Sequence, residues 1–358
     1  MKTTLIVGAG ATLAEALPSH PKKSLHPPLD GTFFAHCSAS GYRQQRPIRT
    51  YMEAGFGIDP FSEDRGMEEV FNFIYTDAHT GNPSARCLDA YWALISLYRF
   101  ALAATTNPLQ GNSRAGVGAV IRALFEHDPS REFTVITFNQ DLVIEKALER
   151  TAGMAKYSAL PWSIRHAYGI NFSSFNTMVS NSVPFSQSAP SSIQVLKLHG
   201  SLNWVYPVRS GSDPKNALRH TQRNPICVND QSIYNQLTRT VRRSSRRRTQ
   251  DLIPILVPPV YEKSTQVAGL LSSVWDNARA ALLQTEELVI FGYSFPDADF
   301  AAKAMLRHSL HQNDSLSTVH IIDINPAVAG KVADISGTSS FHFYRDVATF
   351  KSVFPDEH

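Results

Sequence analysis

Six short apolar runs, spread over the whole sequence, constrain the fold more than any other feature. Most are continuous rather than alternating in polarity, which is typical of strands buried on both faces of a parallel sheet. Helical patterns lie between several of them, and 141–150, closed by Gly153, is one example. The sequence therefore predicts an α/β fold with a doubly wound, Rossmann-like parallel sheet. The runs cover 4–7, 133–137, 193–198, 253–257, 288–291 and 319–322, with further helices expected over 270–283 and 300–308.

The spacing of the first two runs predicts a helical insertion subdomain. Residues 8–132 separate them, whereas an ordinary βα connection takes about two to six residues. The insertion is placed at 18–128, and 207–250 is expected to be a second, polar and basic excursion from a single domain spanning 1–358. Within the insertion we expect a long, partly ordered loop over 18–60, a helix over 85–106 that is apolar nearly all round and therefore buried, and helices over 67–76 and 114–126.

Charge and cysteine content exclude several classes of protein. The 358 residues carry 34 Lys+Arg against 31 Asp+Glu, and 43% of them are apolar. This composition excludes a disordered chain and gives no field of one sign that would demand a nucleic-acid partner. Three widely spaced cysteines argue against a disulfide-stapled secreted fold and a CxxC…CxxC zinc module, so we expect a reducing, cytoplasmic compartment and no metal. The N-terminal run is interpreted as a strand and turn rather than a signal peptide, and no membrane span is expected.

The turn after the first run, Gly8-Ala9-Gly10-Ala11-Thr12, is a candidate phosphate-binding loop. Glycines let a backbone approach a pyrophosphate, and the N-terminus of the following helix presents free N–H groups. Leu13 departs from the spacing of a GxGxxG dehydrogenase fingerprint. A tight strand-to-helix turn without a ligand is the alternative.

Four further polar motifs follow predicted strands. Because the carboxyl ends of parallel strands line the ligand crevice of an open α/β sheet, these motifs are placed where ligands bind. The alternatives are structural: Asp141, Asp297 and Asp299 are suited to capping helices, Asn139 to bonding loop backbone, and most of the thirteen histidines are expected to be structural. Position sets His199 apart, since an imidazole there can accept a proton near neutral pH. The motifs are TFNQD at 137–141, KLHGS at 197–201, FGYSFPDAD at 291–299 and IDINP at 322–326.

The ordered set of motifs resembles the sirtuin-like family of NAD-consuming domains. GAGAT at 8–12 is similar to the family's GAGxS loop, TFNQD to its TQNID motif and KLHGS to its catalytic-histidine motif. FGYSF at 291–295 stands where sirtuins have a Gly-Thr-Ser strand end, and IIDINP at 321–326 stands where they have the Asn that binds adenosine.

The resemblance implies NAD+ as the substrate and gives each motif a role. Asn139 would hold the ribose and orient a water molecule, and His199 would contact the ribose hydroxyls and act as general base. The other implied NAD+-binding residues are Gly8, Ala9, Gly10 and Thr12 at the pyrophosphate, Asp141 at the carboxamide, Gly292 and Ser294 at a phosphate or ribose oxygen, and Asp323 and Asn325 at the adenosine ribose.

Two departures distinguish the chain from sirtuin deacetylases. Only Cys227 follows the histidine motif, where deacetylases carry four zinc-binding cysteines, and the GIPDFR segment after GAGxS is absent. The chain therefore looks like the bacterial sirtuin-like domains of anti-phage defence. That resemblance implies an NAD+ glycohydrolase that depletes NAD+ and works as a homo-oligomer or with a HerA-type ATPase partner.

Two other functions stay open, and protein deacylation is disfavoured. The first is a non-catalytic NAD-binding or scaffold subunit. The second is a nucleic-acid-associated subunit that binds through the arginine-rich run at 242–248, although such a run is more often a solvated loop.

Overall fold

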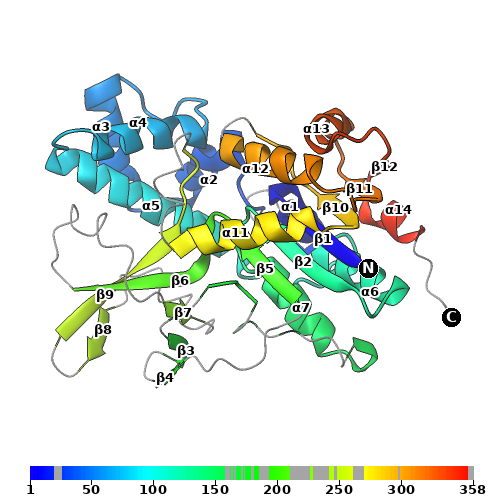
Figure 1. Ribbon diagram of the computed structural model, residues 1–358. Helices are drawn as coiled ribbons and strands as arrows, with labels where there is room; N and C mark the ends of the chain where they lie inside the picture. Colours follow the sequence, from blue (N-terminus) through cyan, green and yellow to red (C-terminus); the bar gives the residue numbers. More distant parts are fainter. Residues whose placement is uncertain are drawn as a thin grey trace.

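The computed structural model has three parts, a parallel sheet covered by helices, a helical unit and a second sheet (Figure 1). The main sheet runs through the centre and right of the view, the helical unit lies at the upper left and the second sheet at the lower left. The structure describes residues 1–19, 26–157, 162, 164, 167–170, 172, 174–178, 181–184, 193–209, 226–228, 242–245, 248–260, 270–296 and 299–353.

The main sheet has six parallel strands in the spatial order β12-β11-β10-β1-β2-β5. Read from β5 and counted along the chain, this is the order 3-2-1-4-5-6 of a doubly wound dinucleotide-binding sheet, so the predicted fold class is confirmed. Five of the six expected runs form its strands, and the short β12 was not expected. The strands are β1 (Lys2–Val7), β2 (Glu132–Thr137), β5 (Ile193–Lys197), β10 (Glu287–Phe291), β11 (Thr318–Ile322) and β12 (His342–Tyr344).

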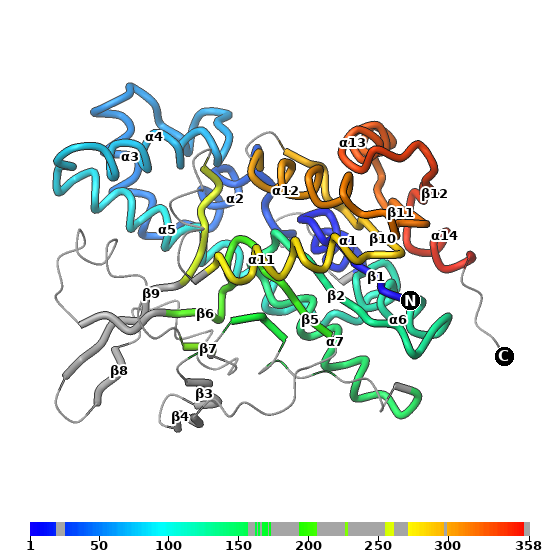
Figure 2. The backbone as a smooth tube through the Cα atoms, viewed as in Figure 1, coloured from blue at the N-terminus to red at the C-terminus, as the bar shows by residue number. Residues whose placement is uncertain are grey.

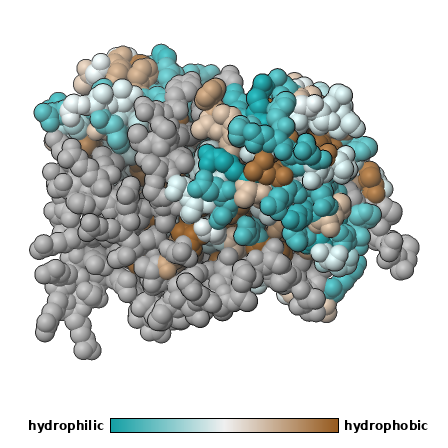
Figure 3. Space-filling model, viewed as in Figure 1, coloured by the Kyte–Doolittle hydropathy of each residue, from teal (hydrophilic) through white to brown (hydrophobic). Residues whose placement is uncertain are grey.

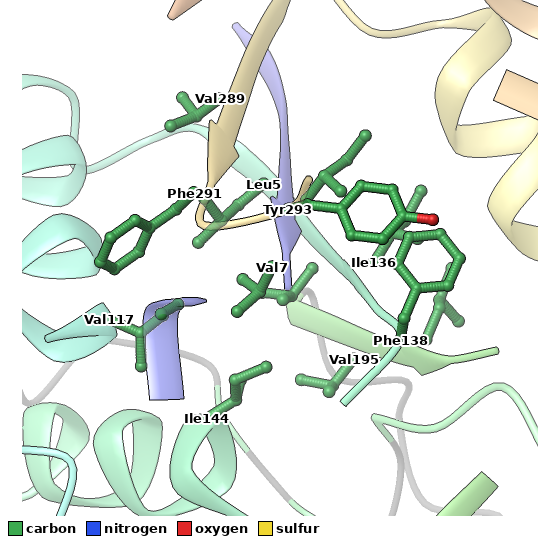
Figure 4. Close-up of a cluster of buried hydrophobic side chains, with 14 of the residues drawn as sticks. Leu5, Val7, Val117, Ile136, Phe138, Ile144, Val195, Val289, Phe291 and Tyr293 are labelled. Carbon is green, nitrogen blue, oxygen red and sulfur yellow. The ribbon is translucent and has the colours of Figure 1, made fainter. Parts of the chain in front are cut away.

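Helices cover both faces of this sheet, which explains why its strands are apolar without alternation. On one face α11 (Leu270–Leu283) packs against β5, and α12 (Phe300–His311) and α13 (Ala327–Ser336) continue the layer. The other layer is built around α6 (Val117–His127), which packs against α1 (Ala9–Ser19), α7 (Val143–Ala152) and α14 (Val347–Lys351). Figure 4 shows how Val117 of α6 and Ile144 of α7 point toward Val7 of the central strand.

A separate helical unit occupies part of the predicted insertion. It comprises η2 (Asp30–Thr32), α2 (Phe33–Ser40), α3 (Gln45–Phe56), α4 (Met67–His79) and α5 (Ala85–Thr106), and it has its own apolar core. The expectation of a partly ordered loop over 18–60 is therefore wrong for α2 and α3. The unit is also smaller than 18–128, because α6 packs into the core of the main sheet.

The long apolar helix α5 is confirmed as a core helix. By length and composition it is the one helix of the described chain that could cross a membrane. Its apolar side chains instead pack into the core of the helical unit, where Leu94 and Leu97 are fully buried. Burial within the fold accounts for its sequence.

The second sheet begins where the main sheet ends. Its strand β6 (Gly200–Arg209) starts directly after His199 and pairs antiparallel with β9 (Arg248–Leu256), with Gly200 opposite Leu256. The run at 253–257 therefore does not belong to the parallel sheet, which corrects the prediction. The other strands are β3 (Ser174–Met178), β4 (Asn181–Pro184), β7 (Ile226–Val228) and β8 (Arg242–Ser245), in the order β4-β3-β7-β6-β9-β8.

The expected excursion at 207–250 contains several of these strands. In particular, the backbone of 242–245 and of Arg248 forms a β8–β9 hairpin, where a solvated loop was expected. Residues 210–225, 229–241 and 246–247 lie outside the described part of the chain. A short helix, η3 (Ala155–Tyr157), completes the described elements.

The helical unit is joined to the rest of the molecule by more than its chain ends. The segment after β9 runs toward the helical unit in Figure 2, and Val260 at its end is fully buried in that unit's core.

On the described part of the face in Figure 3, brown areas are small and separated by teal and white, so this face has the character of a solvated surface.

Candidate active site at the carboxyl edge of the parallel sheet

The predicted motifs meet where the winding of the sheet reverses. β1 lies between β10 and β2, and the chain leaves β1 toward one side of the sheet and β10 toward the other. A crevice at the carboxyl ends of the strands is where such a topology binds ligands. The loops after β1, β2, β5, β10 and β11 all reach this edge, as the shared position of the motifs predicted.

The glycines of the first and fourth motifs let two loops touch. Gly10 donates its N–H to the carbonyl of Gly292 at 2.9 Å, and a Cβ on Gly8 would lie 2.4 Å from that same oxygen. Gly292 has a φ of +60°, and a Cβ there would lie 2.3 Å from the nitrogen of Ala11. The tight packing explains these glycines without a ligand. Ala9 is exposed and Gly10 half-buried, so this part of the turn is accessible.

Asn139, Thr12 and Asp141 form one hydrogen-bonded group. The amide of Asn139 donates to the carbonyl of Gly8 at 2.8 Å and to the hydroxyl of Thr12 at 3.0 Å, and that hydroxyl donates to Asp141 Oδ2 at 2.8 Å. Since both amide hydrogens are used, the group that Asn139 offers to a ligand is the acceptor Oδ1. An acceptor suits a ribose hydroxyl or a water molecule.

Asp141 and Thr12 are both buried, and their polar atoms make internal bonds. Asp141 Oδ1 accepts the N–H of Val143 at 2.9 Å, in the first turn of α7. Asp141 therefore shapes the turn before α7 and is not its N-cap, which is Leu142, so the capping alternative is wrong in detail. Contacts of Thr12 with a pyrophosphate and of Asp141 with a carboxamide stay predictions.

The His199 side chain is nearly buried between an aromatic ring and a carboxylate. This side chain is 10% exposed, and its ring contacts the ring of Phe138 in an edge-type arrangement, with 5.3 Å between the ring centroids. The backbone is held as well, because the carbonyl of His199 accepts from Gln140 Nε2 and from the N–H of Val257, each at 2.9 Å. Gln140 thus connects the loop that carries Asn139 to the residue that carries the imidazole.

Asp299 is a site residue that sequence reasoning missed. Its Oδ1 lies 3.6 Å from His199 Nε2, and its Oδ2 accepts a hydrogen bond from the Tyr293 hydroxyl at 3.1 Å. Tyr293 stacks on Phe138, as Figure 4 shows, with the ring centroids 4.3 Å apart. Asp299 occupies the N-cap position of α12 but makes no side-chain capping bond. Asp297 lies outside the described residues.

Tyr98, from the middle of α5, is a second residue that no sequence signal identified. Burial, together with the negative charges of Asp141 and Asp299, raises the pKa of Tyr98 above its usual value. The hydroxyl is therefore close enough to feel both carboxylates. Tyr98 thus brings the helical unit within electrostatic range of this edge of the sheet.

A buried ion pair supports the site from below. Lys197, the last residue of β5, is fully buried and binds Glu145 Oε1 of α7 at 2.9 Å. It also donates to the backbone carbonyl of Asp141. This pair ties the strand before His199 to the helix that follows the Asn139 loop.

Ser294, Asp323 and Asn325 lie in the loops that follow β10 and β11 at the same edge of the sheet. Asp323 Oδ1 accepts the N–H of Asn325 at 2.8 Å, and Asn325 Oδ1 accepts the N–H of Ala327 at 3.1 Å. Both side chains therefore shape the turn before α13. Burial raises the pKa of Asp323. Ser294 is exposed, and Lys331 donates to its carbonyl at 2.8 Å.

No group of three or more metal-ligating side chains gathers anywhere in the described residues. The three cysteines are buried separately, in α2, α5 and β7.

Comparison with protein families agrees with the sirtuin-like resemblance of the motifs. Residues 134–327, more than half of the chain, match the family described as the SIR2-like domain. The chain belongs to the SIR2-like domain family. Its match extends from β2 to the start of α13 and so includes Asn139, His199 and Asp299. The comparison with curated proteins returned no significant match.

Solved Sir2 structures are similar to this SIR2-like chain. One is a mutant Sir2 with a p53 peptide and NAD, which is 13% identical with a TM-score of 0.40, over 98% of this chain and 91% of the other. Another is a mutant Sir2 homologue with ADP-ribose, which is 12% identical with a TM-score of 0.39, over 98% and 89%.

Proposed function

We propose that this SIR2-like protein is an NAD+ glycohydrolase that splits the bond between nicotinamide and ribose. The observation that supports the proposal is that Asn139 and His199 follow the neighbouring strands β2 and β5 at the carboxyl edge of the sheet, where Gln140 joins their two loops through a hydrogen bond to the carbonyl of His199. Nicotinamide is already a cationic leaving group, so the site has to hold the ribose, place water and exclude competing groups.

The proposed reaction uses few groups. The oxygen of a water molecule, oriented by Asn139 Oδ1, forms a bond to the ribose C1′ and gives its proton to His199. The electron pair of the C1′–N bond passes to the pyridine nitrogen, and neutral nicotinamide and ADP-ribose leave. The accessible turn at Ala9 and Gly10 would face the pyrophosphate of NAD+. Ser294 and Asn325 would lie toward the adenosine half of the NAD+ molecule.

Hydrolysis is favoured over protein deacylation by two features. The whole sequence has three cysteines, one fewer than a four-thiolate zinc module needs. The imidazole is 10% exposed and lies among Phe138, Tyr293 and Asp299, which suits a small nucleophile such as water.

Two substitutions test the proposal directly. Asn139→Ala and His199→Ala should each fold normally and lose NAD+ cleavage by at least ~10²-fold, because a general base and a water-positioning group are removed. Purified protein is incubated with NAD+, and nicotinamide and ADP-ribose are quantified by chromatography, with circular dichroism as the folding control. Full activity in both variants would contradict the assignment of Asn139 and His199 as catalytic residues.

A second arm separates hydrolysis from deacylation. The same incubation is repeated with an acetylated peptide. Under the proposal, nicotinamide release does not depend on the peptide and no acetylated ADP-ribose forms. Release that requires the peptide would establish deacylation instead.

The biological setting is part of the proposal. Unregulated NAD+ hydrolysis is toxic, so we propose cytoplasmic, anti-phage NAD+ depletion gated by self-association or by a HerA-type ATPase. Cleavage assays with and without such partners test this. If no NAD+ is cleaved with any of these partners, the result would count against an enzyme and would favour the scaffold alternative.

A further inference from the structure

Asp299 has the position of a helix cap without its bonds. Two other N-cap residues show the usual pattern: Ser84 accepts the N–H of Cys87 at the start of α5, and Asp346 accepts that of Thr349 at the start of α14. No such bond is made by Asp299 at the start of α12, although its carboxylate is almost fully buried. Burying a carboxylate is costly unless its charge is paired or hydrogen-bonded, so the partners of Asp299 should be sought outside the helix.

The partners lie in the active site. Oδ2 of Asp299 is fixed by the Tyr293 hydroxyl at 3.1 Å, and Oδ1 is 3.6 Å from His199 Nε2. That distance is within ion-pair range and longer than a hydrogen bond. Tyr293 is held in turn by its stack on Phe138, whose ring also contacts His199. One aromatic ring therefore sets the relative positions of the imidazole and of the tyrosine that orients the carboxylate.

We propose that Asp299 is the positioning residue of His199, a buried negative charge that makes the imidazole more basic and stabilises it once it has taken the proton of water. Asp299 touches the base and not the substrate. The inference rests on the proposed function for its kinetic consequence, while its effect on the imidazole itself does not need turnover.

Other ionisable groups at this edge do not replace Asp299. Asp141 is engaged with Thr12 and Val143, and the Tyr98 hydroxyl is held neutral by burial and by the two carboxylates. Beneath the site, Lys197 is paired with Glu145. Asp299 is the carboxylate at ion-pair distance from the His199 ring among the described residues.

Asp299→Asn is a suitable test because asparagine caps a helix as well as aspartate does and has the same shape. If Asp299 were only a cap, the variant would behave as wild type. Under the proposal the thermal midpoint stays near wild type and kcat falls at least about tenfold, since a general base contributes ~10²–10⁴ and its partner supports part of that. KM stays unchanged, and the acid limb of the kcat profile moves to lower pH because an opposite charge has been removed.

Two further variants sharpen the comparison. Tyr293→Phe keeps the stack on Phe138 and removes the bond to Asp299 Oδ2, so it should reduce kcat in the same direction by a smaller factor. Asp346→Asn, at the true N-cap of α14, should leave kcat unchanged.

The decisive measurement does not require activity. The pKa of His199 is followed by nuclear magnetic resonance in protein labelled with ¹⁵N-histidine, and the signal is assigned by its loss in His199→Gln. Asp299→Asn should lower this pKa by about one unit or more. An unchanged or raised pKa, or an unchanged kcat, would overturn the role of Asp299. If wild type fails to cleave NAD+, the proposed function fails, while the titration still decides this inference.

Discussion

Lys197 shows how one side chain holds two parts of the site together. Lysine is rarely buried unless it is paired. Here its ammonium binds Glu145 and the carbonyl of Asp141, and Glu145 also accepts the hydroxyl of Tyr168 at 2.9 Å. The sequence shows a lysine at the end of an apolar run and gives no indication of its partner, which lies on a helix 52 residues away.

Removing this lysine should destabilise the fold strongly. Lys197→Met leaves the charge of Glu145 buried, and we expect the free energy of unfolding to fall by about 3–5 kcal/mol in urea denaturation. The double variant Lys197→Met/Glu145→Leu should recover much of the loss, since both charges are then gone.

An exposed ion pair provides the control for Lys197. Arg279 binds Asp276 at 2.7 Å with side chains 47% and 69% exposed. Arg279→Met should cost at most about 1 kcal/mol. An equally small cost for Lys197→Met would show that its buried pair contributes little.

At the scale of elements, the parallel strands were the most predictable part. Their continuous apolar sequences follow from burial on both faces. The predicted ranges lie within the observed strands for 4–7, 133–137, 288–291 and 319–322. β9 was assigned to the wrong sheet, because a local pattern does not say which strand it will pair with. Three-residue β12 is too short to give a pattern.

The site was predictable in its motifs and less so in its contacts. Asn139 and His199 follow strands whose ends must meet. For Asp299 the sequence offers capping as the alternative, and the residue does stand at the start of α12, while its partner His199 lies 100 residues earlier in the chain. Tyr98 belongs to a helix whose apolar sequence indicated only a core.

The approach of α5 to the site leads to a prediction for Tyr98. Tyr98→Phe keeps the ring, which packs on Phe33 and Phe71, and removes the hydroxyl near Asp141 and Asp299. Removing a hydroxyl that lies within electrostatic range of both carboxylates should change kcat/KM for NAD+ about three- to tenfold with little change in stability. Steady-state kinetics measure both this variant and a control, Tyr91→Phe, whose ring is buried in the core of the helical unit. The control should show no change in kcat/KM. Equal kinetics for both variants would place the Tyr98 hydroxyl outside the site.

At the scale of the whole molecule, buried charged groups lie at both ends of the parallel strands, which form the carboxyl and the amino edge of the main sheet. The carboxyl edge carries the site. At the amino edge, Glu287 binds Arg131 at 2.6 Å and accepts the hydroxyl of Thr3 at 2.9 Å, with His320 at 3.5 Å. Burial alone would raise the pKa of Glu287, but His320 and Arg131 lower it from 4.5 to about 2.

Acid stability should therefore depend on Glu287. A carboxyl whose pKa is lowered by folding stabilises the protein fully above its unfolded value of 4.5, and this stabilisation is lost as pH falls toward about 2. Its size is on the order of 3 kcal/mol. Urea denaturation at pH 7, 4.5 and 3 should show wild type losing stability between the last two values.

Glu287→Gln provides the comparison for this dependence. The variant should be less stable than wild type at pH 7 and should lose less on going from pH 4.5 to 3. Glu132→Gln, whose side chain is 73% exposed, should change stability little at pH 7. Equal losses in wild type and Glu287→Gln would remove Glu287 from the explanation.

Val260 has a consequence for building chimaeras of this protein. The helical unit is contiguous over 30–106, yet its core is completed by a valine that follows the second sheet, more than 150 residues later. A transplanted 30–106 segment would carry a hole where that side chain belongs, and its host would have to supply a matching apolar residue. Exchanges between relatives should therefore move position 260 together with the helices.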